Sequence, residues 1–369
     1  MNPATALRSA YVRREPVSAA PAPDGKSRNF AAILFGDLAS AAMTLVAAAL
    51  IAMLAPRIAS WAIVNGVWSG DGEACRAADG ACWVFLREKA RFILFGIYPP
   101  DQHWRPALAI GLILAMTIWS LPPRHWTRTT FVGWLVTVAA MLLLLKGGVL
   151  GLADVPSSSW GGLPVTVLLT IASLGLGFPL AVALALGRQA QSRGTHTLCI
   201  GIIETIRGLP LLSLLFIASI MLPLMLPDGM SLDKLARALV ALTLFSAVYL
   251  AEVLRGGLQS LPAGQREAAQ ALGLSCVQAT RLIILPQAIR KVIPPLTNTV
   301  IVMVKNTSLV LVVGLFDLLS AGRAAATDPA WPAAYKETYL FVGLIYFLIC
   351  FGISRYSIWL ERRARIGQS

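Results

Sequence analysis

The chain has 369 residues, of which 57% are hydrophobic and only 13% are charged, and its formal net charge is +13. Soluble proteins carry about a quarter charged residues, so the composition excludes an ordinary soluble domain and favours a membrane protein. The basic residues stand between long apolar runs and form no basic helix with interleaved aromatic residues, which argues against nucleic acid as a partner. We therefore expect membrane lipid to surround the chain.

The N-terminal third begins with a polar segment. Residues 1–30 are basic and rich in Pro and Ala, which predicts a disordered cytoplasmic tail. The apolar run 31–56 exceeds the roughly 7–15 residues of a signal-peptide core and fits a retained spanning helix. Residues 57–105 carry both charge signs, glycine-rich turns and an amphipathic piece at 84–94, and we expect them to form a periplasmic loop.

Two of the five cysteines lie in this loop. A disulfide between Cys75 and Cys82 is chemically allowed there and would be unusual in a cytosolic loop. Cys199, Cys276 and Cys350 lie in or beside apolar or cytoplasmic stretches, where they are expected to behave as small hydrophobic residues. The Cys and three His residues lack metal-ligand spacing, so we expect no metal site.

Apolar runs at 106–121 and 131–153 complete a three-span accessory unit over residues 31–158. Residues 159–369 then predict a five-span core. Its apolar runs are 163–186, 199–226, 236–254, 296–315 and 339–359. The fold class expected is an all-α integral membrane protein with about eight transmembrane helices. Because Lys and Arg concentrate in the short loops on one side, we place both termini in the cytoplasm.

The loop 258–295 is the longest polar interruption of the core. Residues 267–272 are almost all good helix formers, and Gly273 suits a left-handed C-terminal cap. Ser275 and Gln278 have capping-box spacing, which predicts a second helix. Pro286, and later a Pro pair, should limit regular helix. Small side chains on the first helix would let a groove of another protein approach its backbone.

The fixed positions of this loop carry a family resemblance. They are Glu267, Ala268, Ala269, Gly273, Ile283, Leu285 and Pro286, with the intervening gaps. Their pattern resembles the EAA loop of the membrane subunits of ABC importers. The segments 161–188, 204–212, 249–260 and 305–309 are similar to the polar amino acid permeases. The additional N-terminal spans resemble the longer permeases of general L-amino acid importers.

The resemblance implies an ABC-importer permease fold with a cytoplasmic coupling helix that enters a cleft of an ATPase. Carried over position by position, the coupling residues are Glu267, Ala268, Ala269, Gly273, Leu285 and Pro286. A Walker A sequence is absent from the chain, so ATP and Mg would be bound by a separate cytoplasmic ABC ATPase subunit, expected as a dimer, and this chain would bind no cofactor.

The other implied partners are a periplasmic substrate-binding protein and a second homologous permease subunit. The implied activity is import of polar L-amino acids across the bacterial inner membrane by alternating access. Three questions stay open: which amino acids are carried, which permease chain holds them, and what the three N-terminal spans do.

Polar residues inside the 296–315 span form a second candidate site, because charges at the bilayer centre are costly and tend to be functional. They are Asn298, Lys305, Asn306, Thr307 and Ser308. One interpretation is a substrate path. The other, which we favour for Lys305, is a structural network in which Lys305 pairs with Glu252 or bonds to a neighbouring helix. Near the cytoplasmic helix ends, Glu204 with Arg207, and Glu252 with Arg255, have the spacing of interfacial ion pairs.

The alternative function is an ion-coupled secondary transporter of amino acids or similar small solutes, using Lys305, Glu252 and Asp37. It predicts inverted repeats and uptake without an ATPase. No nucleophile, base and orienting group stand together in the sequence, so the chain is expected to be a transport subunit and not an enzyme.

Overall fold

The computed structural model describes residues 34–227, 232–332 and 334–366; the tail predicted over 1–30 lies outside them. The chain divides into two compact units, residues 1–64 and 65–369. In the first unit, α3 (Leu38–Ala59) is followed by a π-helical turn (Ser60–Val64), and none of the residues of either is buried. This helix is long and apolar enough to cross a membrane.

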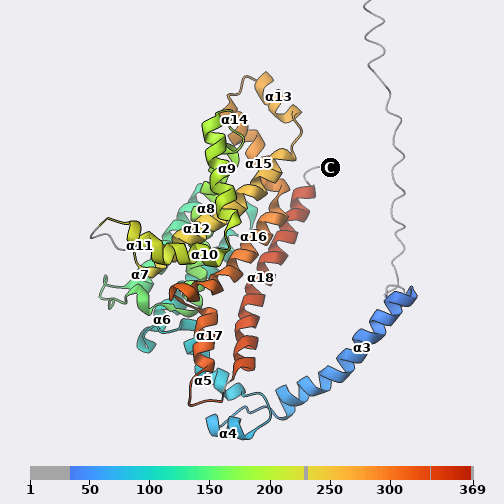
Figure 1. Ribbon diagram of the computed structural model, residues 1–369, viewed down its shortest axis with the longest axis vertical. Helices are drawn as coiled ribbons and strands as arrows, with labels where there is room; N and C mark the ends of the chain where they lie inside the picture. The colour runs from blue at the N-terminus through green and yellow to red at the C-terminus, as the bar shows by residue number, and fades with distance from the viewer. Residues whose placement is uncertain (1–33, 228–231, 333, 367–369) are drawn as a thin grey trace, which may run out of the picture. The chain divides into compact units, whose positions relative to one another are not determined.

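The second unit is a bundle of helices (Figure 1). Its α-helices are α4 (Gly72–Ala77), α5 (Trp83–Phe95), α6 (Trp104–Ser120), α7 (Arg128–Lys146), α8 (Gly162–Gly187), α9 (Arg193–Gly208), α10 (Leu211–Phe216), α11 (Leu222–Met225), α12 (Lys234–Gln259), α13 (Gly264–Ala271), α14 (Cys276–Ala279), α15 (Leu285–Lys291), α16 (Ile293–Asn306), α17 (Leu318–Ala326) and α18 (Tyr335–Ile366). A short strand, β1 (Phe316–Asp317), precedes α17. Figure 1 shows α13 and α14 at one end of the bundle and α4 and α5 at the other.

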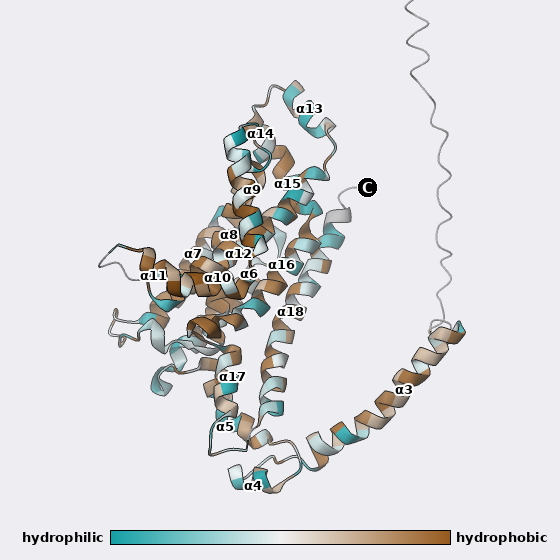
Figure 2. Cartoon of the chain, viewed as in Figure 1, coloured by the Kyte–Doolittle hydropathy of each residue, from teal (hydrophilic) through white to brown (hydrophobic). Residues whose placement is uncertain are grey.

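The prediction of an all-α membrane protein is confirmed. Within the described residues, six helices are long and apolar enough to span a bilayer, and the bent pair α9 with α10–α11 makes up to seven. The helix α6 has 17 residues, which is the short limit for a membrane span, and it corresponds to the remaining one of the eight predicted spans. Figure 2 shows the apolar residues along the middle of the bundle and hydrophilic residues on α13.

The span predicted over 199–226 is sharply bent. α9 ends at Gly208, and the helical path turns by 103° before it resumes at Leu211. Pro210 is the physical cause: it has no N–H for the helical ladder, and it forces Leu209 into an extended conformation with ψ 133°. A π-helical turn (Ile217–Met221) then distorts the remainder of this segment.

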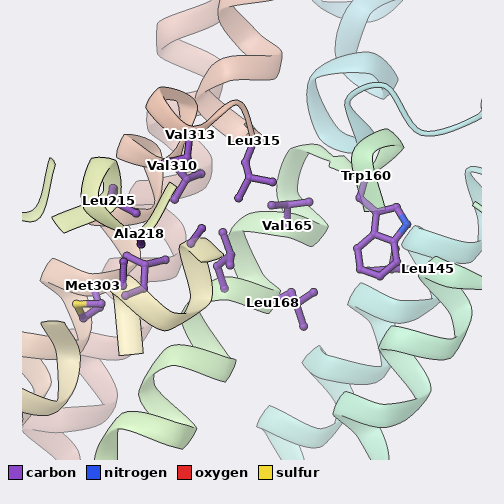
Figure 3. Close-up of a cluster of buried hydrophobic side chains, with 14 of the residues drawn as sticks. Leu145, Trp160, Val165, Leu168, Leu215, Ala218, Met303, Val310, Val313 and Leu315 are labelled. Atoms are coloured by element: carbon purple, nitrogen blue, oxygen red, sulfur yellow. The ribbon is translucent and has the colours of Figure 1, made fainter. Parts of the chain in front are cut away.

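The core of the bundle is the contact between α8 and α12. Gly177 allows their close approach, because a Cβ added there would come within 2.2 Å of the Ser246 hydroxyl. That hydroxyl donates to the Ser173 carbonyl at 2.8 Å, which ties the two helices by a buried hydrogen bond. Leu168 of α8, with Leu215 and neighbouring residues, continues this packing into the apolar cluster of Figure 3.

A buried arginine holds the α6–α7 hairpin. Arg105 is 1% exposed; its Nε donates to the Leu144 carbonyl at 2.6 Å, and its Nη1 donates to the Ala153 carbonyl at 2.9 Å and to Gln102 at 2.5 Å. A cation at these C-terminal carbonyls also complements the dipole of α7. Gly147, with φ 72°, ends α7 earlier than the predicted residue 153.

At the end opposite α13, α4 and α5 are attached to the loop before α18. Cys75 and Cys82 form a disulfide, and the Cys82 N–H donates to Glu337 at 2.9 Å. Arg76 donates to carbonyls of the 329–330 segment, and Lys89 forms an ion pair with Asp328. The N-terminal third and the last third of the sequence thus meet here. The proposed division at residues 158 and 159 stays a prediction.

Candidate functional site

The polar loop folds as a short exposed helix followed by a glycine turn. α13 begins at Gly264, earlier than the predicted Glu267. Gly273 has φ 74° in the left-handed region, as predicted. Its N–H bonds to the Gln270 carbonyl at 2.9 Å, and the Leu274 N–H bonds to the Ala269 carbonyl at 3.2 Å, so the turn satisfies the free carbonyls of α13.

The second helix begins with the predicted capping box. The Ser275 hydroxyl accepts from the Gln278 N–H at 3.3 Å, and the Gln278 side chain accepts from the Ser275 N–H at 2.9 Å. Pro286 marks a limit of regular helix, as expected. α14 ends at Ala279, a π-helical turn (Thr280–Ile284) follows, and α15 begins at Leu285 with Pro286 in its first turn, where the missing N–H of proline is tolerated.

The base of the loop is rigidly packed on the bundle. Ile284, Ala288 and Val292 are buried against α12 and neighbouring helices. On α12, Gly257 permits this contact, since a Cβ there would lie 2.8 Å from the Ala288 carbonyl oxygen. Lys291 donates to the Ser260 carbonyl at 2.9 Å, which further joins α15 to the end of α12.

The predicted coupling residues occupy two faces of this loop. Ala269 is only 1% exposed and faces inward. Glu267, Ala268, Gly273 and Pro286 are exposed, and Leu285 is partly buried. Gln287 also donates to Gln265 at 3.1 Å, holding α13 to α15. The loop is a protrusion whose exposed surface combines small residues such as Ala268 and Gly273 with polar side chains such as Glu267, a shape suited to a groove in another protein.

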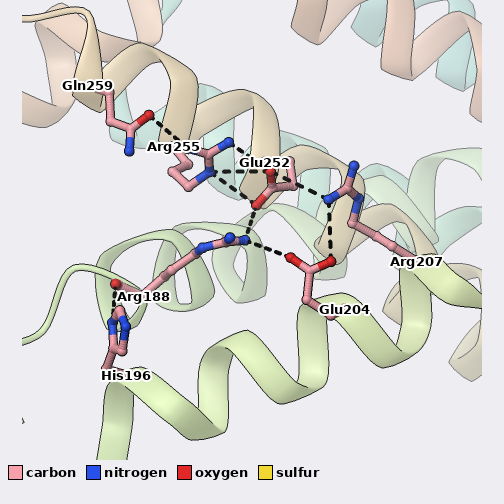
Figure 4. Close-up of polar contacts among 7 residues, drawn as sticks. All are labelled: Arg188, His196, Glu204, Arg207, Glu252, Arg255 and Gln259. Carbon is pink, nitrogen blue, oxygen red and sulfur yellow. Dashed lines mark hydrogen bonds and ion pairs between the residues drawn. The ribbon is translucent and has the colours of Figure 1, made fainter. Parts of the chain in front are cut away.

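Beneath the loop lies a cluster of five charged side chains from three helices (Figure 4). Glu252 on α12 is its centre: its carboxylate lies 2.5 Å from Arg188 at the end of α8, 3.0 Å from Arg255, and 3.6 Å from Arg207 on α9. Glu204 lies 3.3 Å from Arg188 and 3.9 Å from Arg207. The cluster therefore links the C-terminal parts of α8, α9 and α12.

The sequence predicted the two ion pairs separated by three residues, and both are confirmed. It missed Arg188 as the bridge between them. Arg188 follows α8 directly, and the signal available was its position at the C-terminal end of α8, level with Glu252 near the C-terminal end of the parallel helix α12. The predicted pairing of Lys305 with Glu252 is wrong, because three arginines from nearer helix turns surround that carboxylate.

The candidate path residues do not converge. Asn298 and Lys305 are exposed on one face of α16, whereas Thr307 is buried on the other side of the chain. The hydroxyls of Thr307 and Ser308 donate to carbonyls three residues earlier, at 2.7 and 2.8 Å. Asn306 is half-buried. In the described part of the chain, no group of three His, Cys, Asp or Glu residues could hold a metal ion.

Comparison with known proteins gives a family. Residues 177–366 match the family described as binding-protein-dependent transport system inner membrane component. The chain is 41% identical to the inner membrane amino-acid ABC transporter permease protein YhdY of Escherichia coli (strain K12), over 91% of this chain and 92% of that protein. It is 34% identical to the glutamate/glutamine/aspartate/asparagine transport system permease protein BztC of Rhodobacter capsulatus, over 97% and 98% of the two chains.

A crystal structure of an amino acid ABC transporter with histidines is 32% identical over 55% of this chain and 92% of that chain, with a TM-score of 0.47. The family match covers the loop, its base and the whole charge cluster from Arg188 to Arg255. The full-length relatives extend the similarity through the N-terminal spans. The chain therefore belongs to the binding-protein-dependent transport system inner membrane components, as a permease that serves transport and is not an enzyme.

Proposed function

We propose that this chain is the permease of an ATP-driven importer of polar L-amino acids. The support is the similarity over more than nine tenths of the chain to permeases whose names specify amino acids. Family membership favours this function over an ion-coupled secondary transporter. A binding protein and a separate ABC ATPase are the partners that this family implies.

The coupling surface consists of α13, the Gly273 turn and Pro286. The observation that carries this assignment is that α13 projects from the bundle with Ala269 buried and Ala268 exposed. A short helix of this kind can enter a cleft of the ATPase, while its buried side stays attached to the permease. ATP and Mg would remain on that partner.

Movement at α13 has a direct route into the membrane helices. The close contact of Ala288 with Gly257 passes a displacement of the loop to α12. The Glu252 cluster then joins α12 to α8 and α9 through Arg188 and Arg207. Because these are packed helices and charge-assisted bonds, the unit can move as one body between two arrangements.

We place the α13 end in the cytoplasm together with both termini. The basic residues of the loop agree with this orientation. The Cys75–Cys82 disulfide at the other end agrees with the oxidising periplasm of a bacterial inner membrane. The binding protein would dock at that periplasmic end.

A second, homologous permease chain would complete the assembly above an ATPase dimer. Lys305 is exposed on α16 in this chain, beside Asn298 and Val302 on one helix face. A charge facing lipid at the bilayer centre would cost at least about 2.5–3.5 kcal/mol. We therefore propose that this face lies against the second permease or lines the substrate path between the two chains.

The test is reconstitution of the complete transporter in vesicles. Uptake of polar amino acids should require ATP and the binding protein and should persist after the ion gradients are collapsed. Ala268→Arg should abolish uptake with normal membrane insertion. Uptake that survives ATP depletion but fails without an ion gradient would contradict the proposal.

A further inference from the structure

A large apolar groove lies between α6, α8, α16 and α18. Its volume is about 900 Å³, and Ile113 of α6, Ile171 of α8, Val304 of α16 and Leu348 of α18 are among its lining residues. Arg363 is the one charged side chain that lines it among the described residues. The groove is therefore mostly apolar along its length and cationic at one end.

That end has the features of a membrane–water interface. Arg363 lies over the Trp359 ring, 4.7 Å from its centroid, and the Tyr356 hydroxyl donates to the Leu121 carbonyl at 2.7 Å. Figure 2 shows α18 becoming hydrophilic toward this C-terminal end. Aromatic side chains with a polar tip and arginines are the usual anchors at headgroup level.

A smaller cavity of about 390 Å³ adjoins the groove at Tyr356, which lines both. Ser120, Thr127 and Thr130 supply hydroxyl groups to it, and its remaining lining is aromatic. The loop that bears these residues also carries two exposed arginines, at positions 124 and 128. Hydrogen-bond donors and positively charged side chains therefore lie beside the apolar groove.

We propose that this groove binds one anionic glycerophospholipid, with an acyl chain between α6 and α18 and the phosphate beside Arg363. The argument is charge complementarity: the mouth is basic, and the slot behind it is lined mostly by apolar side chains such as Leu348 and Ile113. The threonine hydroxyls that also line the slot donate to backbone carbonyls four residues earlier in their own helices. Basic pockets between transmembrane helices bind anionic headgroups in this manner. A polar amino acid would leave its own charges unpaired in the slot.

Two glycines of α18 provide a matched test. Gly352 lines the groove, whereas Gly343 does not, and a Cβ added at either position meets no atom within 4 Å. Gly352→Leu should fill the groove without disturbing the helix. Arg363→Gln removes the charge at the mouth, and Arg362→Gln is its neighbouring control.

The experiment is native mass spectrometry of the full-length chain in mild detergent, titrated with phosphatidylglycerol or with phosphatidylcholine of the same acyl chains. The wild type and the controls Gly343→Leu and Arg362→Gln should bind phosphatidylglycerol preferentially. Arg363→Gln should weaken that binding about fivefold and remove the preference. Gly352→Leu should reduce binding of both lipids.

Equal binding of the two lipids by the wild type, or unchanged binding by both Gly352→Leu and Arg363→Gln, would overturn the proposal. A cysteine introduced at position 352 reports on a protein occupant. If the purified transporter shields it from a thiol reagent until a partner chain is removed, a protein helix fills the groove and the lipid assignment is wrong. Because Arg363 is exposed, its variant remains informative even if the groove-filling variant does not fold.

Discussion

Gly257 of α12 lies so close to Ala288 of α15 that a single added Cβ would stand 2.8 Å from the Ala288 carbonyl oxygen. The same added atom would lie 2.7 Å from the Val292 side chain. This contact joins the base of the polar loop to α12, one of the two central helices of the core. If α13 is the coupling helix, this contact is one route by which its movement would reach α12.

The first prediction concerns this contact. Gly257→Ala should lower the free energy of unfolding by about 1–3 kcal/mol through overpacking and should reduce ATP-driven uptake. Gly256→Ala is the control, because its Cβ would meet no atom within 4 Å and alanine favours a helix. Thermal unfolding and vesicle uptake measure the two effects. If the two variants had the same stability and the same uptake, the close contact at Gly257 would not explain the effect.

The second prediction concerns Glu252 in the charge cluster. Glu252→Gln would leave Arg188, Arg207 and Arg255 close together without this carboxylate, and should destabilise the fold by about 1–3 kcal/mol. Glu204→Gln should cost less than about 1 kcal/mol, because the Glu204 side chain is 52% exposed.

A double-mutant cycle between Arg188 and Glu252 isolates their coupling energy from other effects of the two substitutions. We expect a favourable coupling that decreases only partly in high salt, since the pair is partly buried. If Glu204→Gln destabilised the fold more than Glu252→Gln does, Glu252 would not be the centre of the cluster.

The third prediction concerns Arg105 in the α6–α7 hairpin. Arg105→Met removes the donors to the Leu144 and Ala153 carbonyls and should destabilise the fold by about 2–4 kcal/mol. Arg105→Lys keeps the charge but not the planar arrangement of donors, so its effect should be intermediate. Melting temperatures in detergent measure the series. If the Arg105→Met variant were as stable as the wild type, the buried arginine would make no net contribution to the stability of the fold.

The fourth prediction concerns the pH dependence of the Lys89–Asp328 ion pair. A hydrogen bond from Lys89 and one from the Ala330 N–H lower the pKa of Asp328 below its ordinary value. Because the folded-state pKa is the lower one, the stabilisation is full above the unfolded pKa of about 3.9 and is lost as pH falls through the folded value. The melting-temperature difference between wild type and Asp328→Asn should be present at pH 7 and vanish in acid. A difference that does not change with pH would contradict this.

Much of the coupling loop was predictable from the sequence because its information is local. Gly273 and the Ser275 capping box act over three or four residues, and both appear where predicted. Pro286 also lies in the first turn of a new α-helix, so its effect was local and predictable. The π-helical turn before Pro286 was not predicted, and its last residue, Ile284, is buried in the cluster that contains α12.

Longer-range features were predicted less well. The broken span at Pro210 is a local effect that hydropathy alone conceals, since the residues on both sides are apolar. The bridging role of Arg188 depends on the register between α8 and α12, which the sequence does not specify. Lys305, exposed on α16, and Thr307, buried just after the end of α16, likewise lie on different sides of the chain, because the orientation of this segment against the core is set by tertiary packing.

The most direct test of the account is whether the ATPase covers α13. In a Cys276→Ser background, a cysteine at Ala268 should react freely with a thiol reagent in the isolated chain, because both positions are exposed. In the assembled transporter we expect that cysteine to be protected and to regain reactivity when Gly273→Asp disrupts the turn. Undiminished labelling at position 268 in an assembly that retains its ATPase would contradict the assignment of α13 as the coupling helix.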